Sequence, residues 1–246
     1  MITSAANPRV KLLRSLHERK HRRELGLCLL EGVRLVEEAI PLGLQHAVYA
    51  PERLSATAAG RALRQRLERL PDVEQVDERL LDAISDTVTS QGVLAAAPIP
   101  AAQALPPEGH VLVLDGIADP GNAGTMLRTA RAAGAAGVVA MRSTTDLWAP
   151  KVLRAGMGAH FHLPLLVDVV DTSVLGGRQL LRADAHGGDP YWKVDWSRPS
   201  AIVIGSEAHG SAIDAHRVTI PMAEGAESLN AAAAAAVLLF AARRSG

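Results

Sequence analysis

Short apolar runs alternate along the second half of the chain with segments whose hydrophobic residues recur at helical spacing. The runs VLVLD at 111–115, GVVAM at 137–141 and AIVIG at 201–205 are continuous and of strand length. Such runs are typical of strands that are buried on both faces of a parallel sheet. Between the first two, residues 122–133 place Met, Leu and Ala on one helical stripe. Strands that alternate with helices predict an α/β domain with parallel strand pairing.

Two further helices are predicted in this half. One covers residues 149–158, and the other is the alanine-rich run at 229–244 that closes the pattern. Alanine is the best helix former, and Arg243 and Arg244 lie at the negative end of this helix, where cations are favourable. The first half shows a weaker alternation of the same kind and predicts a small α/β domain. Its expected helices cover 7–23, 34–40 and 60–70, and its expected strands cover 27–32, 47–50, 73–76 and 92–96.

A proline-rich stretch separates the two halves. PIPAAQALPPEGH at 98–110 has four prolines and no hydrophobic periodicity, which indicates a linker. A chain of 246 residues is long enough for one or two domains with buried cores. We therefore expect a smaller domain over 1–97, a linker over 98–110 and a larger domain over 111–246.

Composition favours a globular protein of a reducing compartment. Cys28 is the one cysteine of the sequence and lies in an apolar run, so it forms no internal disulfide, and we expect it to be buried and inert in the cytoplasm. No run approaches the ~18–20 apolar residues that a membrane span needs, and the first residues lack the apolar core of a signal peptide. We expect no membrane association.

Charge is balanced overall but uneven along the chain. Lys and Arg number 26, as do Asp and Glu, so net charge neither favours nor excludes a nucleic-acid partner. The stretch 9–23, however, has one acid, Glu18, among seven cations, namely Arg9, Lys11, Arg14, Arg19, Lys20, Arg22 and Arg23. A local field of that sign attracts phosphate, although the same pattern also describes an ordinary solvated helix face.

Polar, glycine-containing loops follow the apolar runs of the second half. DPGNAG at 119–124 leads into a helix, with Asn122 as its expected cap. The first-turn N–H groups would then face an anion at the strand end. Arg128 lies four residues beyond Gly124, about one helical turn along, and either points toward the same crevice or lies on a solvated helix face.

Two more loops of this type follow. GSEAHG at 205–210 places Glu207 at the mouth of a strand, where a carboxylate either orients an arginine or a ribose hydroxyl or simply faces water. AEGAESLN at 223–230 offers Ser228 as a helix cap and Asn230 in the first helical turn. Because open α/β sheets bind ligands at the carboxyl ends of their strands, three such loops predict one binding crevice.

Several chemistries are disfavoured by the sequence. HERKH at 17–21 has zinc-protease spacing, but its Arg-Lys pair within a cationic run repels a metal ion, so we expect no metal site. The glycine fingerprints of dinucleotide-binding enzymes and P-loop NTPases and the nucleophile elbow of α/β-hydrolases are absent. An aromatic content of 3% also disfavours a base-stacking sheet of the RRM type.

Three ordered motifs resemble those of the SpoU/TrmH family of RNA ribose 2′-O-methyltransferases. They are DPGNAGTMLRTA at 119–130, VIGSEAHG at 203–210 and IPMAEGAESLN at 220–230. The first domain is similar, more weakly, to that family's L30e/L7Ae-like substrate-binding domain, through stretches at 7–16, 29–39 and 91–95. The resemblance implies a trefoil-knotted α/β domain with a parallel sheet, which periodicity alone does not reveal.

The resemblance also implies roles for individual residues. S-adenosylmethionine would be the cofactor, and its adenosine would be enclosed by Gly205, Ile220, Met222 and Leu229. The chemistry and its support would fall to Asn122, Arg128, Glu207, Ser228 and Asn230. RNA would be held by Arg9, Lys11, Arg19, Lys20, Arg22 and Arg23. Dimerisation completes each site in relatives, so a homodimer is expected. One departure is Ala232, where relatives often have serine; either a polar contact is missing or the helix favours alanine.

The implied reaction is methyl transfer from S-adenosylmethionine to a ribose 2′-OH in structured RNA. The additional first domain favours 23S ribosomal RNA, by analogy with relatives. Three alternatives stay open at this point: a tRNA 2′-O-methyltransferase, a base methyltransferase on the same scaffold, and a non-catalytic RNA-binding protein.

Overall fold

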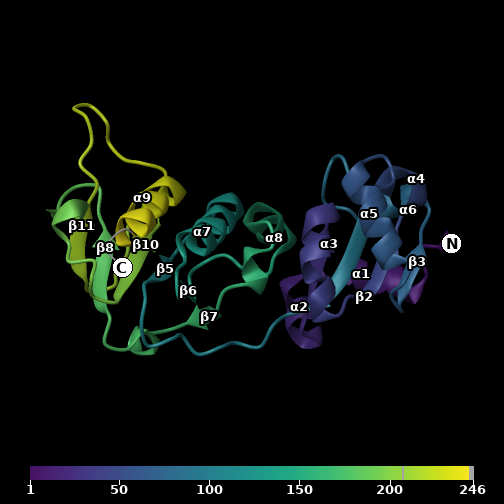
Figure 1. Ribbon diagram of the computed structural model, residues 1–246, viewed down its shortest axis with the longest axis horizontal. Coiled ribbons are helices and arrows are strands. Elements are labelled where there is room, and N and C mark those ends of the chain that lie inside the picture. Colours follow the sequence, from purple (N-terminus) through teal and green to yellow (C-terminus); the bar gives the residue numbers. More distant parts are fainter. Residues whose placement is uncertain (207, 244–246) are drawn as a thin grey trace. The chain divides into compact units, whose positions relative to one another are not determined.

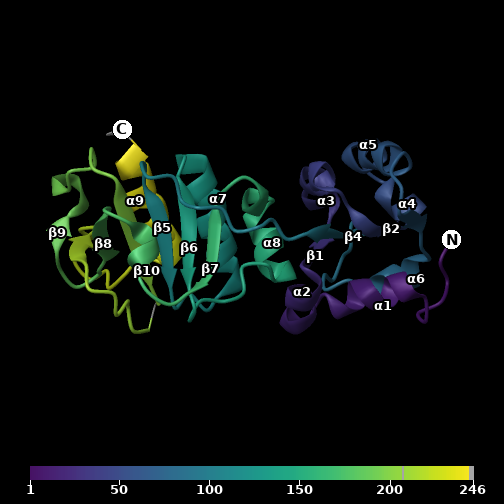
Figure 2. The same cartoon turned by 90° about the horizontal axis from the view of Figure 1, so that it is seen from below.

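The computed structural model describes residues 1–206 and 208–243. The chain divides into two compact units, shown in Figures 1 and 2. The first unit comprises Met1–Pro100 together with Trp148–Phe161, and the second comprises Ala101–Leu147 together with the chain from His162 onward. The segment Trp148–Phe161 lies in the sequence within the predicted larger domain over 111–246, after the apolar run at 137–141. In the structure it packs with the first unit. No described helix is both long enough and apolar enough to cross a bilayer.

The first unit is built on a four-stranded mixed sheet. Its spatial order is β1 (Leu27–Glu31), β4 (Val93–Pro98), β2 (Gln45–Tyr49) and β3 (Val73–Gln75). The strand β4 pairs antiparallel with both β1 and β2, whereas β2 and β3 are parallel. The apolar runs of the first half therefore form the strands that their pattern predicted.

Helices cover both faces of this sheet (Figure 2). Leu13 and Leu81 pack on one face with Leu29 and Leu94 of the strands, and all four are buried. The other face is covered by α3 and α5. The helices are α1 (Pro8–Ser15), α2 (Arg19–Leu25), α3 (Val33–Ala39), α4 (Pro51–Leu54), α5 (Ala58–Leu67), α6 (Glu78–Asp82) and α8 (Pro150–Gly156), with short 3₁₀ turns η1 (Ile40–Leu42) and η2 (Ala159–Phe161).

The basic segment predicted as one helix over 7–23 forms two helices instead. The helix α1 ends at Ser15 and α2 begins at Arg19. The guanidinium of Arg22 donates hydrogen bonds to the carbonyls of Leu16 (2.8 Å) and His17 (2.7 Å). In a continuous helix these carbonyls would be bonded by backbone N–H groups, so a side chain here replaces the helix ladder at the break.

The second unit contains a seven-stranded sheet in which every pairing is parallel. Its central strands are the apolar runs at 111–115, 137–141 and 201–205 that the sequence predicted, whereas its outer strands were not predicted. Outer strands are only partly buried and lack a continuous apolar run, as the pattern of β11 shows. In spatial order the strands are β7 (Leu165–Val169), β6 (Gly137–Met141), β5 (Val111–Asp115), β10 (Ser200–Gly205), β8 (Gln179–Ala183), β11 (His216–Thr219) and β9 (Asp189–Pro190).

Two long helices lie together against this sheet (Figure 1). The helix α7 (Pro120–Ala133) packs on β5 and β6, and α9 (Ala231–Arg243) packs on β10 and on α7. The other face of the sheet is covered by irregular chain instead: Leu105, Leu175 of η3 (Ser173–Leu175) and Ile213 pack over Val111, Val113 and Val203. A further 3₁₀ turn, η4 (Tyr191–Lys193), follows β9.

The proline-rich segment is fixed in its second half by one buried arginine. Arg178, which is 8% exposed, donates to the carbonyls of Gly109 (3.1 Å), Glu108 (3.2 Å) and Pro106. Burial lowers the pKa of Arg178 from its ordinary value. Backbone carbonyls therefore solvate this charge, and the segment lies against the sheet although it has no regular secondary structure of its own.

Candidate cofactor and RNA site

A cavity of about 730 Å³ opens at the carboxyl ends of β8, β10 and β11 in the second unit. This is where parallel α/β sheets bind their ligands, and the volume falls within the roughly 300–1,000 Å³ of small-molecule sites. Three segments form its walls: the end of β8 at 182–186, residues 205–206 and 208–211 after β10, and the chain before α9 through Ile220, Met222 and 228–231.

The four residues predicted to hold the cofactor all line this cavity. They are Gly205, Ile220, Met222 and Leu229. At Gly205 a Cβ atom would lie 2.2 Å from the carbonyl carbon of Gly210, so only glycine lets the following loop fold back at this point. Ser206 and Gly210 close that loop through two backbone hydrogen bonds of 2.9 and 2.8 Å.

Of the residues predicted for chemistry, three are brought together. Ser228 and Asn230 line the cavity, and the Asn230 side chain donates through Nδ2 to Oδ1 of Asn122 at 3.1 Å. Arg128 is exposed on α7, and its side chain makes no hydrogen bond or ion pair within the part of the chain that the structure describes. Glu207 lies outside the described residues.

The caps of the two helices differ from those predicted. Asp119, and not Asn122, caps α7, because Oδ1 of Asp119 accepts from the backbone N–H of Asn122 at 2.6 Å and Pro120 occupies the first helical position. Asn230, and not Ser228, caps α9, which begins at Ala231. Asn122 is not used as a cap, so its side-chain oxygen can accept a hydrogen bond. Asn230 caps α9 with its oxygen, so its side-chain NH₂ group can donate to Asn122.

Asp115 fixes the surroundings of the cavity and was not recognised in the sequence. This aspartate ends β5, and its carboxylate accepts from the hydroxyls of Ser211 (2.7 Å) and Ser143 (3.3 Å). Ser211 follows the loop after β10, whereas Ser143 follows β6. A single carboxylate thus connects the ends of three neighbouring strands.

The end of β8 is a second feature that sequence reasoning missed. Asp184, which lines the cavity, accepts from Nε of Arg217 (2.8 Å) and from the backbone N–H of His186 (2.9 Å). The hydrogen bond from Arg217 is the main cause that lowers the pKa of Asp184. The sequence pattern that could have identified this wall of the cavity is RADAHGG at 182–188. Here a strand ends in polar and glycine residues, as it does before the other loops.

The basic residues of the first unit divide into two groups. Lys11, Arg19, Lys20 and Arg23 are exposed on α1 and α2. Arg9 is instead paired with Asp72 at 2.6 Å and Glu74 at 3.0 Å. The first group is exposed to solvent, where a polyanion can reach it, and Lys20 of this group also lies 3.8 Å from Glu24. Arg9 is held between two carboxylates of its own unit.

The structure corrects the prediction for Arg22. Only 3% of this residue is exposed, and its guanidinium bonds the carbonyls at the end of α1. A buried guanidinium in this position serves folding and is not accessible to an RNA phosphate. The HERKH histidines also bond backbone carbonyls, His17 that of Ile84 at 2.7 Å and His21 that of Ser15 at 3.3 Å.

Two protein-family models match this chain, one in its first part and one in its second. The model of the SpoU rRNA Methylase family matches residues 109–240, and that of the MRM3-like substrate binding domain matches residues 7–95. The chain therefore belongs to the SpoU rRNA methylase family.

Individual relatives agree over almost the full length. The chain is 33% identical to the 23S rRNA (guanosine(2553)-2′-O)-methyltransferase RlmP of Bacillus subtilis, over 97% of each chain. A crystal structure of an RNA 2′-O ribose methyltransferase superposes with a TM-score of 0.82 and 32% identity, covering 99% of this chain and 98% of that one. The AdoMet-bound rRNA methyltransferase of Sinorhizobium meliloti gives a TM-score of 0.83 and 31% identity, covering 99% and 97%.

These similarities confirm the class of protein that the motifs predicted. The fold is that of the SpoU methyltransferases, a knotted parallel α/β domain preceded by a substrate-binding domain. The protein is an S-adenosylmethionine-dependent RNA methyltransferase of the ribose 2′-O type.

Proposed function

We propose that this protein methylates a ribose 2′-OH in 23S ribosomal RNA, with the first unit holding the RNA and the second performing the transfer. The observation that carries the proposal is the cavity at the strand ends, where all four residues expected around the cofactor come together. The name of the Bacillus subtilis relative, aligned over nearly the whole chain, supports ribosomal RNA and the 2′-O position.

The cavity fits the cofactor in size and in the groups it presents. The glycine at 205 keeps backbone close to the cavity, while Ile220, Met222 and Leu229 add apolar surface for a nucleoside. When bound, S-adenosylmethionine supplies a methyl group that its sulfonium already makes electrophilic. The protein then has to hold the reacting atoms in line, and well-oriented reactions gain up to about 7–11 kcal/mol from such positioning.

The asparagine pair supports this geometry. Asn230 lines the cavity and is bonded to Asn122, so the first turns of α7 and α9 are held at a fixed separation. Ser228 precedes this contact on the cavity wall and is a candidate to orient the target ribose. Glu207, by its place two residues beyond Gly205, is a candidate partner for an arginine or a ribose hydroxyl.

Arg128 acts as a hydrogen-bond donor to RNA in this proposal. Arginine stays protonated in proteins and is a poor base, but its fork of N–H groups matches a phosphate. Arg128 is exposed on α7, and the first turn of this helix holds Asn122, the hydrogen-bond partner of the cavity-lining Asn230. A phosphate held by Arg128 beside the target nucleotide would accept the proton of the 2′-OH, and S-adenosylmethionine would supply the methyl group that replaces this proton.

Lys11, Arg19, Lys20 and Arg23 hold RNA phosphates on the first unit. These cations contact the backbone and carry no base specificity, while the 2′-OH requirement itself rejects DNA. We place the enzyme in the cytoplasm, as a homodimer in which the partner completes the site.

The function is tested by mapping the methyl group. The purified protein, S-adenosylmethionine and an unmodified 23S transcript are incubated, and the RNA is digested to nucleosides for mass spectrometry. A ribose-methylated nucleoside is expected, and the corresponding site should lose its modification in a strain without the gene. A methyl group on a base would identify a base methyltransferase. A failure to bind S-adenosylmethionine in calorimetry would leave a non-catalytic RNA-binding protein, and activity on tRNA alone would move the substrate to tRNA.

A further inference from the structure

One tryptophan of the second unit is exposed, unlike the two others of the chain. Trp192 is 60% exposed, whereas Trp148 and Trp196 are 7% and 5% exposed. Trp192 lies in the turn η4, with Tyr191 packed edge-on against it at a ring-centroid distance of 5.2 Å. A large aromatic surface is thereby presented to solvent in a protein that has few aromatic residues.

The segment around Trp192 is held rigidly by buried or partly buried side chains. The indole N–H of Trp196 donates to the carbonyl of Tyr191 at 2.8 Å. Gln179 donates to the carbonyl of Asp195 at 2.8 Å, and the hydroxyl of Ser200 donates to that of Arg198 at 2.8 Å. Three carbonyls of the segment 191–200 are therefore anchored, so the exposed side chains lose little backbone freedom when they bind a ligand.

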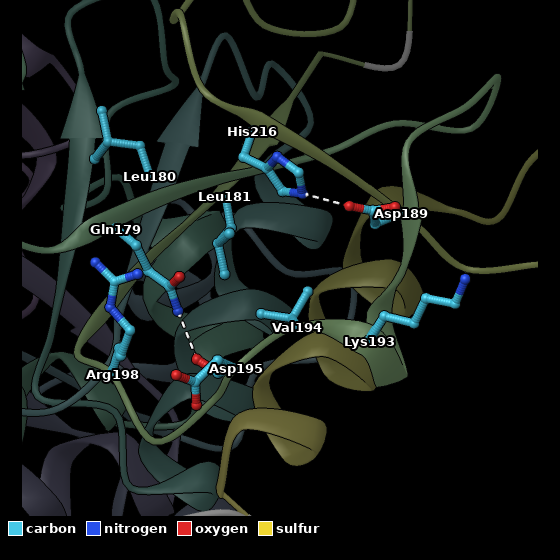
Figure 3. Close-up of a pocket in the computed structure, with 9 residues that line it drawn as sticks. All are labelled: Gln179, Leu180, Leu181, Asp189, Lys193, Val194, Asp195, Arg198 and His216. Carbon is cyan, nitrogen blue, oxygen red and sulfur yellow. Dashed lines mark hydrogen bonds and ion pairs between the residues drawn. The ribbon is translucent and has the colours of Figure 1, made fainter.

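A polar hollow of about 400 Å³ adjoins this segment (Figure 3). Its rim has two exposed cations, Lys193 and Arg198. Neither has a carboxylate within ion-pair distance among residues 1–206 and 208–243. Arg198 acts electrostatically on Asp195 of the same hollow without a direct ion pair. The hollow therefore presents two cations that the described residues do not hold in direct ion pairs.

The acids of the hollow are already engaged. Asp189 is paired with His216 at 3.0 Å, a contact visible in Figure 3. Oδ1 of Asp195 accepts from the backbone N–H and the hydroxyl of Ser197, at 3.1 and 2.6 Å. The hydrogen bonds from Ser197 and the charge of Arg198 lower the pKa of Asp195. An incoming anion therefore meets Lys193 and Arg198 beside two carboxylates that already have partners.

The hollow lies away from the cofactor cavity. It is lined by the beginnings of β8 and β11, at Gln179 and His216, whereas the cavity opens at the ends of the same strands. Along β8 the two linings meet between Leu181 and Arg182, and successive side chains of a strand point to opposite faces of the sheet. A ligand in the hollow thus contacts different residues from the cofactor, and a partner that engages both places has to be large.

We propose that Trp192, Lys193 and Arg198 form a second RNA contact, on the catalytic unit itself, where Trp192 stacks on an unpaired base and the two cations hold phosphates of the same strand. Aromatic side chains combined with cations are how proteins bind single-stranded nucleic acid. A second copy of the chain fits less well, because the cores of protein interfaces are depleted in lysine and other charges. The proposal rests on the function given above, in that the partner is the RNA substrate.

The test measures RNA affinity of the full chain with an unmodified 23S transcript over a range of salt concentrations. Trp192→Ala should weaken binding by about 10-fold, within the range for loss of one stacked base, with little change in salt dependence. Trp192→Phe should restore most of the affinity. The double variant Lys193→Ala/Arg198→Ala should lower the slope of log K against log salt by about 1.4, the value for two single-strand phosphate contacts. Arg69→Ala, an exposed cation of the first unit, is the matched control for lost charge.

The outcomes separate the possibilities. Affinity and slope equal to wild type in both the Trp192→Ala and the double variant would overturn the proposal. So would a Trp192→Ala variant whose mass in sedimentation differs from wild type, because the turn would then be a contact between copies. Thermal melting of each variant checks that the turn still folds, and Trp192→Phe covers the case in which alanine does not. Failure of the main function looks different, since the wild-type protein would then make no ribose-methylated nucleoside, whatever these variants bind.

Discussion

Asn230 and Asn122 are 108 residues apart in the sequence and joined by one hydrogen bond of 3.1 Å. The Asn230 side chain has two functions at once. Its oxygen accepts from the backbone N–H groups of Ala232 (2.9 Å) and Ala233 (3.3 Å) and so begins α9. Its amide group donates to Asn122 in the first turn of α7. The start of α9, which lines the cavity, is therefore joined to the first turn of α7 by this contact.

Two variants separate the functions of Asn230. Asn230→Asp keeps the oxygen that caps α9 but loses the donor to Asn122, so we expect near wild-type stability with reduced methylation. Asn230→Ala loses both and should also lower the free energy of unfolding by about 1 kcal/mol, as for other lost caps. Urea unfolding and methylation of a 23S transcript measure the two effects. Equal activity of Asn230→Asp and wild type would show that the link to Asn122 has no catalytic role.

Arg128 is expected to act on RNA and not on the cofactor. Arg128→Ala should reduce turnover by about 10²-fold or more, the size of effect seen when one donor to a transition state is removed. Calorimetry should give an unchanged affinity for S-adenosylmethionine. Arg131→Ala, also exposed on α7, is the matched control and should retain activity. Turnover that is intact in Arg128→Ala would remove this residue from the mechanism.

The neighbours Arg22 and Arg23 should respond differently to substitution. Arg22→Ala removes the donor to two carbonyls at the end of α1 and should destabilise the protein by about 1–3 kcal/mol, the cost of leaving buried polar groups unpaired. Arg23→Ala, at an exposed position, should leave stability within about 0.5 kcal/mol and weaken RNA binding. Thermal unfolding and RNA binding at fixed salt distinguish them. The reverse pattern would mean that Arg22 reaches RNA.

A buried ion pair holds α8 to the rest of the first unit. Arg154 donates to Glu31 at 3.1 Å, and the Glu31 side chain is 3% exposed. Arg154→Met should destabilise the first unit by about 3–5 kcal/mol, because it leaves a buried carboxylate without its cation. Converting both partners, Glu31→Met/Arg154→Met, should be less harmful than the single change.

The control for this pair lies on the surface of the same unit. Arg66 and Glu37 are 2.6 Å apart, and their side chains are 45% and 47% exposed. Arg66→Met should change stability by less than about 1 kcal/mol, as for exposed ion pairs. Equal effects of Arg66→Met and Arg154→Met in urea unfolding would contradict a special role for burial.

Asp184, on the wall of the cavity, makes the stability of the fold depend on pH. The hydrogen bond from Arg217 lowers the pKa of Asp184 in the folded protein, so this group stabilises the fold above the unfolded pKa of about 3.9. The contribution is lost as pH falls below that value through the folded pKa. Asp184→Asn should therefore melt at a lower temperature than wild type at pH 7, and the difference should shrink below about pH 4. A difference that is constant from pH 7 to pH 3 would exclude this coupling.

Strands and helices with a strong pattern were predictable from local sequence. The runs at 111–115, 137–141 and 201–205 form β5, β6 and β10 because strands buried on both faces need continuous apolar residues. The helix caps were harder. Asp119 and Asn122, like Ser228 and Asn230, are all good caps by residue type, and the choice depends on where the helix axis starts, which packing decides.

The sequence by itself determined the family, the central strands of the second unit and several of the residues that line the cavity, because these depend on ordered motifs and on apolar periodicity. Only the tertiary structure decided which cations are available. Arg22 and Arg23 are adjacent and chemically identical, but one is buried against carbonyls and the other faces solvent. The contact of Asn230 with Asn122 and the exposure of Trp192 likewise arise from segments distant in sequence, and no local pattern encodes such neighbours.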